Sequence, residues 1–135
     1  MNANFWKGMV AAWVTASVIV NVVNGLLLQS VWSVLEAQRV IRYYGGIMTA
    51  MVGFEVILFI GVYILCEFVE KLSQVKRAQP WKVGLQIGIL LGMAQVAGFL
   101  MYPVPVVVPI VGGLGEVVAM TAAALVYSKL DPQRT

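Results

Sequence analysis

Two glutamates near the middle of long apolar stretches are the residues of this sequence with the clearest potential for chemistry. Glu55 lies at the centre of residues 46–66, and Glu116 lies at the centre of residues 106–127. An ionisable side chain at the centre of a membrane helix costs about 3 kcal/mol, so both carboxyls should point inward, pair with amides or face a partner. Burial disfavours the charged form of a carboxyl, and a second carboxyl nearby disfavours it further, so at least one of a meeting pair would be protonated.

Amide side chains lie near the depth of these carboxyls. At a rise of about 1.5 Å per residue, Asn21 and Gln95 fall within about 5 Å of the plane of the two glutamates. Asn24 shares a helix face with Asn21, and Ser17 lies one turn away on the same side. The set of intramembrane polar residues is Glu55, Glu116, Asn21, Asn24 and Gln95. One interpretation is a site for a proton or small cation. The alternatives are protonated glutamates that hold the helices together, or contacts to a partner subunit.

The composition requires lipid as the solvent for most of the chain. Of 135 residues, 61% are hydrophobic and 11% are charged, and the mean hydropathy is +0.89. A soluble domain carries about 25% charged residues, so this chain cannot build a water-facing surface. A spanning helix needs about 20 apolar residues. The sequence predicts an all-α, four-helix transmembrane bundle in a single domain, with helices at residues 9–29, 46–77, 82–102 and 106–127.

A short amphipathic helix is expected between the first two spans. Val31, Val34, Leu35 and Ile41 recur at helical spacing, and charged residues occupy the other faces. Aromatic residues around it suit the headgroup region, so we expect this helix to lie on the membrane. Binding of a partner is the alternative for the same apolar face.

Small residues at four-residue spacing predict close packing between the helices. Gly84, Gly88 and Gly92 form one such ridge, and Gly115 and Ala119 belong to another. Ridges of this kind allow helix backbones to approach closely in a membrane. We therefore assign these residues to helix packing. The GGLG sequence at 112–115 is not a phosphate loop, because it lacks the preceding strand and the following lysine.

The basic residues predict the orientation of the chain. With four spans, both termini and the loop near residue 80 share one side, and this side carries seven of the nine basic residues. The positive-inside rule places it in the cytoplasm. Trp6, Trp81 and Tyr127 are expected at the same interface. Four of the basic residues could hold anionic lipid headgroups: Lys71, Lys76, Arg77 and Lys82.

Several functions are disfavoured by the residues that the sequence lacks. There is no histidine and a single cysteine, Cys66, so no internal disulfide, zinc site or histidine-based catalytic set can form. We expect no enzyme, no metal and no cofactor. The basic residues flank apolar spans, so nucleic acid is not an expected partner either.

The second half of the chain resembles a family of small, uncharacterised four-helix membrane proteins of bacteria. The residues that carry the likeness are WKVGLQIGILLGMAQVAG at 81–98, YPVP at 102–105 and GGLGE at 112–116, with NGLL at 24–27 as a looser match. The resemblance implies the four-helix fold and the bacterial inner membrane. It brings no activity and no catalytic residues.

Two functions remain open at this point. The first is an accessory or structural subunit of a larger membrane complex, with other membrane subunits or further copies of the chain as partners besides the lipid bilayer. The alternative is a proton- or cation-coupled channel or carrier that uses Glu55 and Glu116. The first should bury a helix face against other chains, and the second should open the acids to water.

Overall fold

The computed structural model describes residues 3–38, 47–73, 79–99 and 104–130. Throughout these ranges the regular structure is helical. The elements in chain order are α1 (Ala3–Val22), the π-helix η1 (Val23–Leu27), α2 (Gln29–Ala37), α3 (Ile47–Ser73), α4 (Pro80–Phe99) and α5 (Val107–Leu130). The predicted all-α class is confirmed.

Four of these helical segments are long and apolar enough to cross a membrane: Ala3–Leu27, Met48–Leu72, Pro80–Phe99 and Val107–Leu130. The four predicted spans are confirmed, with differences at their ends. The first helix begins at Ala3 rather than residue 9. α4 begins at Pro80 rather than residue 82, because proline at a first helical position lacks an N–H that would have no partner anyway. Residues 74–77 and 100–102 of the predicted spans lie outside the described residues.

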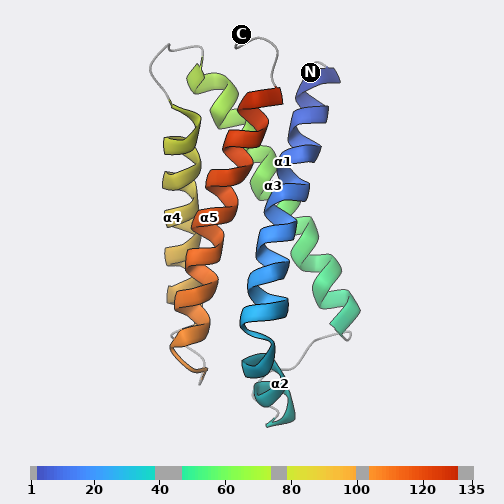
Figure 1. Ribbon diagram of the computed structural model, residues 1–135, viewed down its shortest axis with the longest axis vertical. Coiled ribbons are helices and arrows are strands. Elements are labelled where there is room, and N and C mark those ends of the chain that lie inside the picture. The colour runs from blue at the N-terminus through green and yellow to red at the C-terminus, as the bar shows by residue number, and fades with distance from the viewer. Residues whose placement is uncertain (1–2, 39–46, 74–78, 100–103, 131–135) are drawn as a thin grey trace.

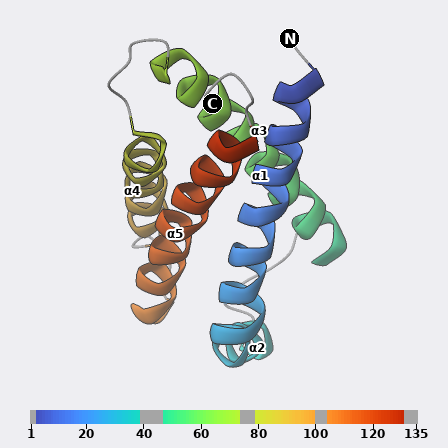
Figure 2. The same cartoon turned by 45° about the horizontal axis from the view of Figure 1, so that its top comes forward.

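The long helices run along one common axis, with α3 inclined to the others. Figures 1 and 2 show α3 crossing behind α1 and α5, with its first turns on the side of the bundle away from α4. The start of α1 and the end of α5 lie at the same end of the bundle. The buried hydrophobic residues of α3 lie between Leu58 and Val69, and none of the described residues before Leu58 on this helix is buried. The first half of α3 therefore contributes little to the core.

The contact between α4 and α5 is the most extensive in the structure, and it depends on glycines. A Cβ atom at Gly84 would lie 2.5 Å from the carbonyl oxygen of Met120. At Gly92 it would lie 2.7 Å from the carbonyl oxygen of Gly113. Because these are backbone atoms, they cannot turn aside, so the close approach of α4 to α5 requires glycine here.

Small residues also line the contact between α1 and α5. Ala12 and Ala16 of α1 and Ala119 of α5 are fully buried in one core cluster. Tyr127 is 2% exposed and lies against Gly8, where its ring carbon is 3.0 Å from the position of the missing Cβ. The expected interface depth of Tyr127 stays a prediction, but its ring packs inside the bundle rather than on its outer surface. The space over Gly8 admits the ring into the core.

The expected short helix between the first two spans is α2, at the end of the bundle opposite the start of α1 (Figure 1). Leu35 of α2 is buried in a small cluster with Leu28 and Val108. The ring of Trp32 lies 6.2 Å from that of Phe99, centre to centre. The apolar face of α2 thus packs on the ends of α4 and α5. Residues 39–46, which include Ile41 of the predicted pattern, lie outside the described residues.

A candidate polar site within the spans

The carboxyl group of Glu55 on α3 meets two polar side chains of α1. The Ser17 hydroxyl donates a hydrogen bond of 2.8 Å to Oε1 of Glu55, and Nδ2 of Asn21 donates one of 3.0 Å to the same oxygen. Ser17 and Asn21 are one turn apart, so the regular geometry of α1 brings both donors to one level. Nδ2 of Asn21 also lies 2.8 Å from the carbonyl oxygen and 3.1 Å from the hydroxyl oxygen of Ser17. These bonds tie α1 to the loosely packed half of α3.

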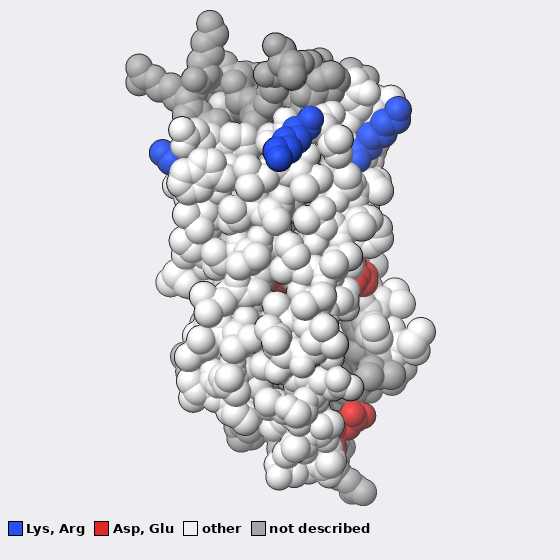
Figure 3. Space-filling model, in the orientation of Figure 1, with Lys and Arg blue, Asp and Glu red and all other residues white. Residues whose placement is uncertain are grey.

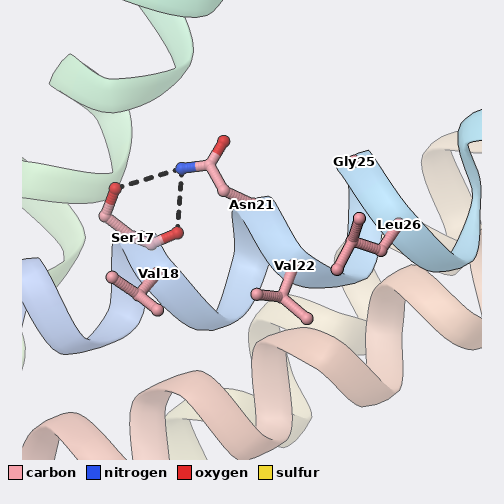
Figure 4. A pocket seen from close by; sticks show the side chains of 6 residues that line it. All are labelled: Ser17, Val18, Asn21, Val22, Gly25 and Leu26. Atoms are coloured by element: carbon pink, nitrogen blue, oxygen red, sulfur yellow. Dashed lines mark hydrogen bonds between the residues drawn. The ribbon is translucent and has the colours of Figure 1, made fainter.

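The same cluster retains hydrogen-bond acceptors to which no described residue donates. Oε2 of Glu55 is buried and has no partner within the described part of the chain. Asn21 is exposed on the outside of the bundle. Figure 4 shows its carboxamide nitrogen turned towards Ser17 and its oxygen turned away. The N–H and O–H groups of Asn21 and Ser17 are therefore already used within the cluster, whereas acceptor oxygens remain.

A shallow hollow of about 370 Å³ lies beside this cluster on the surface of α1 and η1 (Figure 4). Gly25 leaves room at one end, because no atom lies within 4 Å of the place where its Cβ would be. The sequence predicted the polar stripe but not the hollow or its apolar rim, although the four-residue spacing of Ser17, Asn21 and Gly25 was a usable signal. The lining residues are Ser17, Val18, Asn21, Val22, Gly25 and Leu26.

A second polar arrangement lies between α4 and α5. The side chain of Gln95 lies over Gly112, with Nε2 2.5 Å from the position of the missing Cβ. Oε1 of Gln95 is buried and has no partner among the described residues. Glu116, one turn further along α5 than Gly112, is partly buried, and no hydrogen bond joins it to another described residue.

The structure therefore divides the predicted polar set. It brings Asn21 and Ser17 to Glu55, and it joins neither Glu116 nor Gln95 to them by a hydrogen bond. Asn24 donates to the carbonyl oxygen of Val20 on its own helix, at 3.0 Å. Within the described ranges, no group of three or more His, Cys, Asp or Glu side chains is placed to hold a metal ion.

The residues assigned to helix packing lie where helices touch. Gly84, Gly88 and Gly92 face the backbone of α5, and Ala119 is fully buried. A Cβ at Gly115 would lie 3.1 Å from a methyl group of Val23. Gly115 thus sits against η1, one residue before Glu116.

The π-turn η1 follows directly after Asn21 and Val22. Its characteristic bond joins the N–H of Leu28 to the carbonyl oxygen of Val23, five residues back, at 3.1 Å. Turns of this kind occur frequently at functional sites. The sequence indicated a continuous α-helix through this stretch, because Asn24 and Gly25 fit an apolar helix as well as a π-turn. Asn24 and Gly25 therefore point to a different side of the helix than they would in a continuous α-helix.

The described lysines lie at one end of the bundle. Figure 3 shows the basic side chains of this face near that end and only small acidic patches elsewhere. Lys71 pairs with Glu67, four residues earlier on α3, at 3.1 Å. Nζ of Lys82 lies 5.5 Å from the centre of the Trp81 ring. Of the four residues assigned to lipid headgroups, Lys76 and Arg77 lie outside the described residues.

Comparison of the chain with protein-family models, with curated proteins and with solved structures finds no match. The resemblance to small bacterial four-helix membrane proteins therefore stays a prediction. The functional proposal therefore depends on the polar face formed by Ser17, Asn21 and Glu55.

Proposed function

We propose that the chain is a small integral membrane protein that serves as an accessory or structural subunit of a larger membrane complex. The observation that carries this proposal is the polar face on the outside of the bundle. Asn21 is exposed there, next to the Glu55 carboxyl that it binds. An unsatisfied polar group costs several kcal/mol in hydrocarbon, so such a face is stable in a membrane when other protein covers it.

The depth of this face supports covering by a partner rather than by headgroups. Ser17 lies ten residues from the end of its span at Leu27. This corresponds to about 15 Å along the helix, and a bilayer core is about 30 Å thick. Ser17 and its partner Glu55 would thus lie near the middle of the hydrocarbon core. Water and lipid headgroups do not reach this level.

The proposal includes an orientation and a location. The four described lysines that flank the spans are Lys7, Lys71, Lys82 and Lys129, and the element order places all of them at the end where α1 begins. By the positive-inside rule this end faces the cytoplasm, with both termini on that side. Together with the resemblance to bacterial proteins, this favours the inner membrane.

The test is to identify the proteins that co-purify with this chain. We would tag the chain, express it at its native level, extract it in a mild detergent and measure the stoichiometry of co-purified proteins by mass spectrometry. A fixed set of larger membrane proteins is expected. A protein that runs alone, or only with further copies of itself, would contradict the proposal.

A proton- or cation-coupled channel or carrier is the second candidate, and one observation favours it. The Gln95 side chain of α4 lies over Gly112 of α5, one turn before Glu116, and neither Oε1 of Gln95 nor the Glu116 carboxyl accepts a hydrogen bond from a described residue. Such acceptors could take a proton or small cation from a water path. The test is ion flux into liposomes with the pure protein and with its Glu55→Gln/Glu116→Gln double variant. Equal flux for the two proteins removes this candidate.

A further inference from the structure

The exposed polar face has a one-sided hydrogen-bonding character. Nδ2 of Asn21 carries two hydrogens, and its close acceptors are Oε1 of Glu55 at 3.0 Å and the two oxygens of Ser17 at 2.8 and 3.1 Å. The Ser17 hydroxyl hydrogen is directed to Glu55. With Glu55 ionised, no donor of these side chains is left for a neighbour. The remaining capacity is the Oδ1 atom of Asn21, which accepts, and the carboxyl group of Glu55 behind it.

A second copy of the chain is a poor fit to this face. In a two-fold dimer the same patch meets itself, so the Asn21 oxygen of one copy would oppose acceptors of the other. The described part of a second copy also offers no cation at this depth, since its lysines lie at one end of the bundle. Neither a hydrogen bond nor a charge pair would form across such a contact.

The occupant that fits is a helix that brings donors and positive charge. Lysine and arginine carry donors and no acceptors, and each would complement Asn21 Oδ1 together with the neighbouring carboxylate. Gly25, one turn beyond Asn21, leaves open space in which a second helix backbone can approach. The hollow beside these residues has the apolar rim that a helix requires, formed by Val18, Val22 and Leu26.

We propose that this face of α1 and η1, made of Ser17, Asn21 and Gly25 with Glu55 behind them, docks a transmembrane helix of a different protein through a lysine or arginine side chain. The inference rests on the proposed function as a subunit and adds the surface and the chemistry of the partner. A basic side chain on the partner would at the same time neutralise Glu55.

Photocrosslinking in native membranes tests the surface directly. A benzoylphenylalanine would replace Val18 at the edge of the hollow, or Val118 on α5 as the matched control, because both valines are 57% exposed. The adducts would be separated by mass, and the crosslinked peptide sequenced. We expect a Val18 adduct with a second protein, on a membrane span that contains lysine or arginine. The Val118 probe should not give this adduct.

A pair of glycine substitutions tests whether close approach is required. Gly25→Leu fills the open space over η1, and Gly98→Leu fills equally open space on α4, since neither Cβ would meet an atom within 4 Å. Both variants should therefore fold. Gly25→Leu is expected to lower the yield of the Val18 adduct at least tenfold, and Gly98→Leu to leave it unchanged.

Three results would overturn the inference: a Val18 adduct between two copies of the chain, no Val18 adduct above the level of the Val118 control, or a partner span without lysine or arginine. An unchanged yield in Gly25→Leu would refute the close helix contact. These outcomes are distinct from failure of the proposed function. If larger proteins still co-purify in fixed ratio while Val18 gives no adduct, the subunit function stands and the partner docks elsewhere.

Discussion

Substitution of Gly88 by alanine is the sharpest test of how α4 and α5 are held together. A Cβ at this position would lie 2.7 Å from Cα of Val117 and 3.1 Å from the carbonyl oxygen of Glu116. Both are backbone atoms of α5, so no side chain can rotate to relieve the contact. To restore an ordinary separation of about 3.4 Å, the helices must move apart by about 0.7 Å at this level.

The energetic effect of this displacement has two opposing parts. Separation by 0.5–1 Å forfeits about a quarter to a half of each dispersion contact, and overpacking of this kind costs about 1–3 kcal/mol. Alanine also favours the helix over glycine by about 1 kcal/mol, which offsets part of the cost. The net loss in free energy of unfolding should therefore be about 0–2 kcal/mol.

Gly53 on α3 provides the matched control. No atom lies within 4 Å of its missing Cβ, so Gly53→Ala keeps the gain in helix propensity and has no steric cost. We expect it to leave stability unchanged or raise it by about 0.5–1 kcal/mol. The assay is reversible unfolding in mixed micelles, followed by circular dichroism. Equal stability of Gly88→Ala and Gly53→Ala would refute the assigned helix contact.

Three further predictions concern the core. Met120→Ala should cost about 2 kcal/mol because this side chain is 1% exposed and leaves a cavity, while Met93→Ala, at 65% exposed, should cost under about 0.5 kcal/mol in the same assay. Cys66 is fully buried, so a membrane-permeant maleimide should label it after unfolding and not before; rapid labelling of the folded protein would contradict the packing of α3. Gly112→Ala should lower the free energy of unfolding by under about 1 kcal/mol, because the new methyl group displaces the flexible end of Gln95 rather than backbone. A loss as large as that of Gly88→Ala would contradict this.

The sequence was sufficient to predict the elements because their signals are local. Four apolar segments and the short helix between the first two follow from composition and helical spacing over a few residues. Which helices pack against each other was harder to predict from the sequence. Glycine spacing marked one face of α4 for close contact, but nothing in it specified that α5, rather than α1 or α3, would lie there.

Side-chain direction was harder still, and Tyr127 illustrates the reason. Its position near the end of the last span predicted its depth but not its direction: the ring is buried in the bundle, because Gly8 on a helix distant in the sequence leaves space for it. The Phe5 and Tyr127 rings pack edge to face, with their centres 5.8 Å apart. The depth of a residue follows from its position along its own helix. The residues around its side chain depend on where the neighbouring helices carry small residues such as Gly8.

The same distinction explains the division of the polar residues. Their depths could be computed from the rise per residue, but whether they meet depends on the rotation of each helix and on the inclination of α3. The π-turn at Val23–Leu27 alters the rotation of α1 just beyond Asn21, and the first half of α3 lies apart from α4 (Figure 1). Glu55 therefore meets α1 on the outside of the bundle, while Glu116 lies on the α4–α5 side. An acid that binds two donors at the surface is suited to a partner helix, and an acid without donors is suited to proton or cation binding. The two glutamates thus call for separate tests, and a result at one does not decide the role of the other.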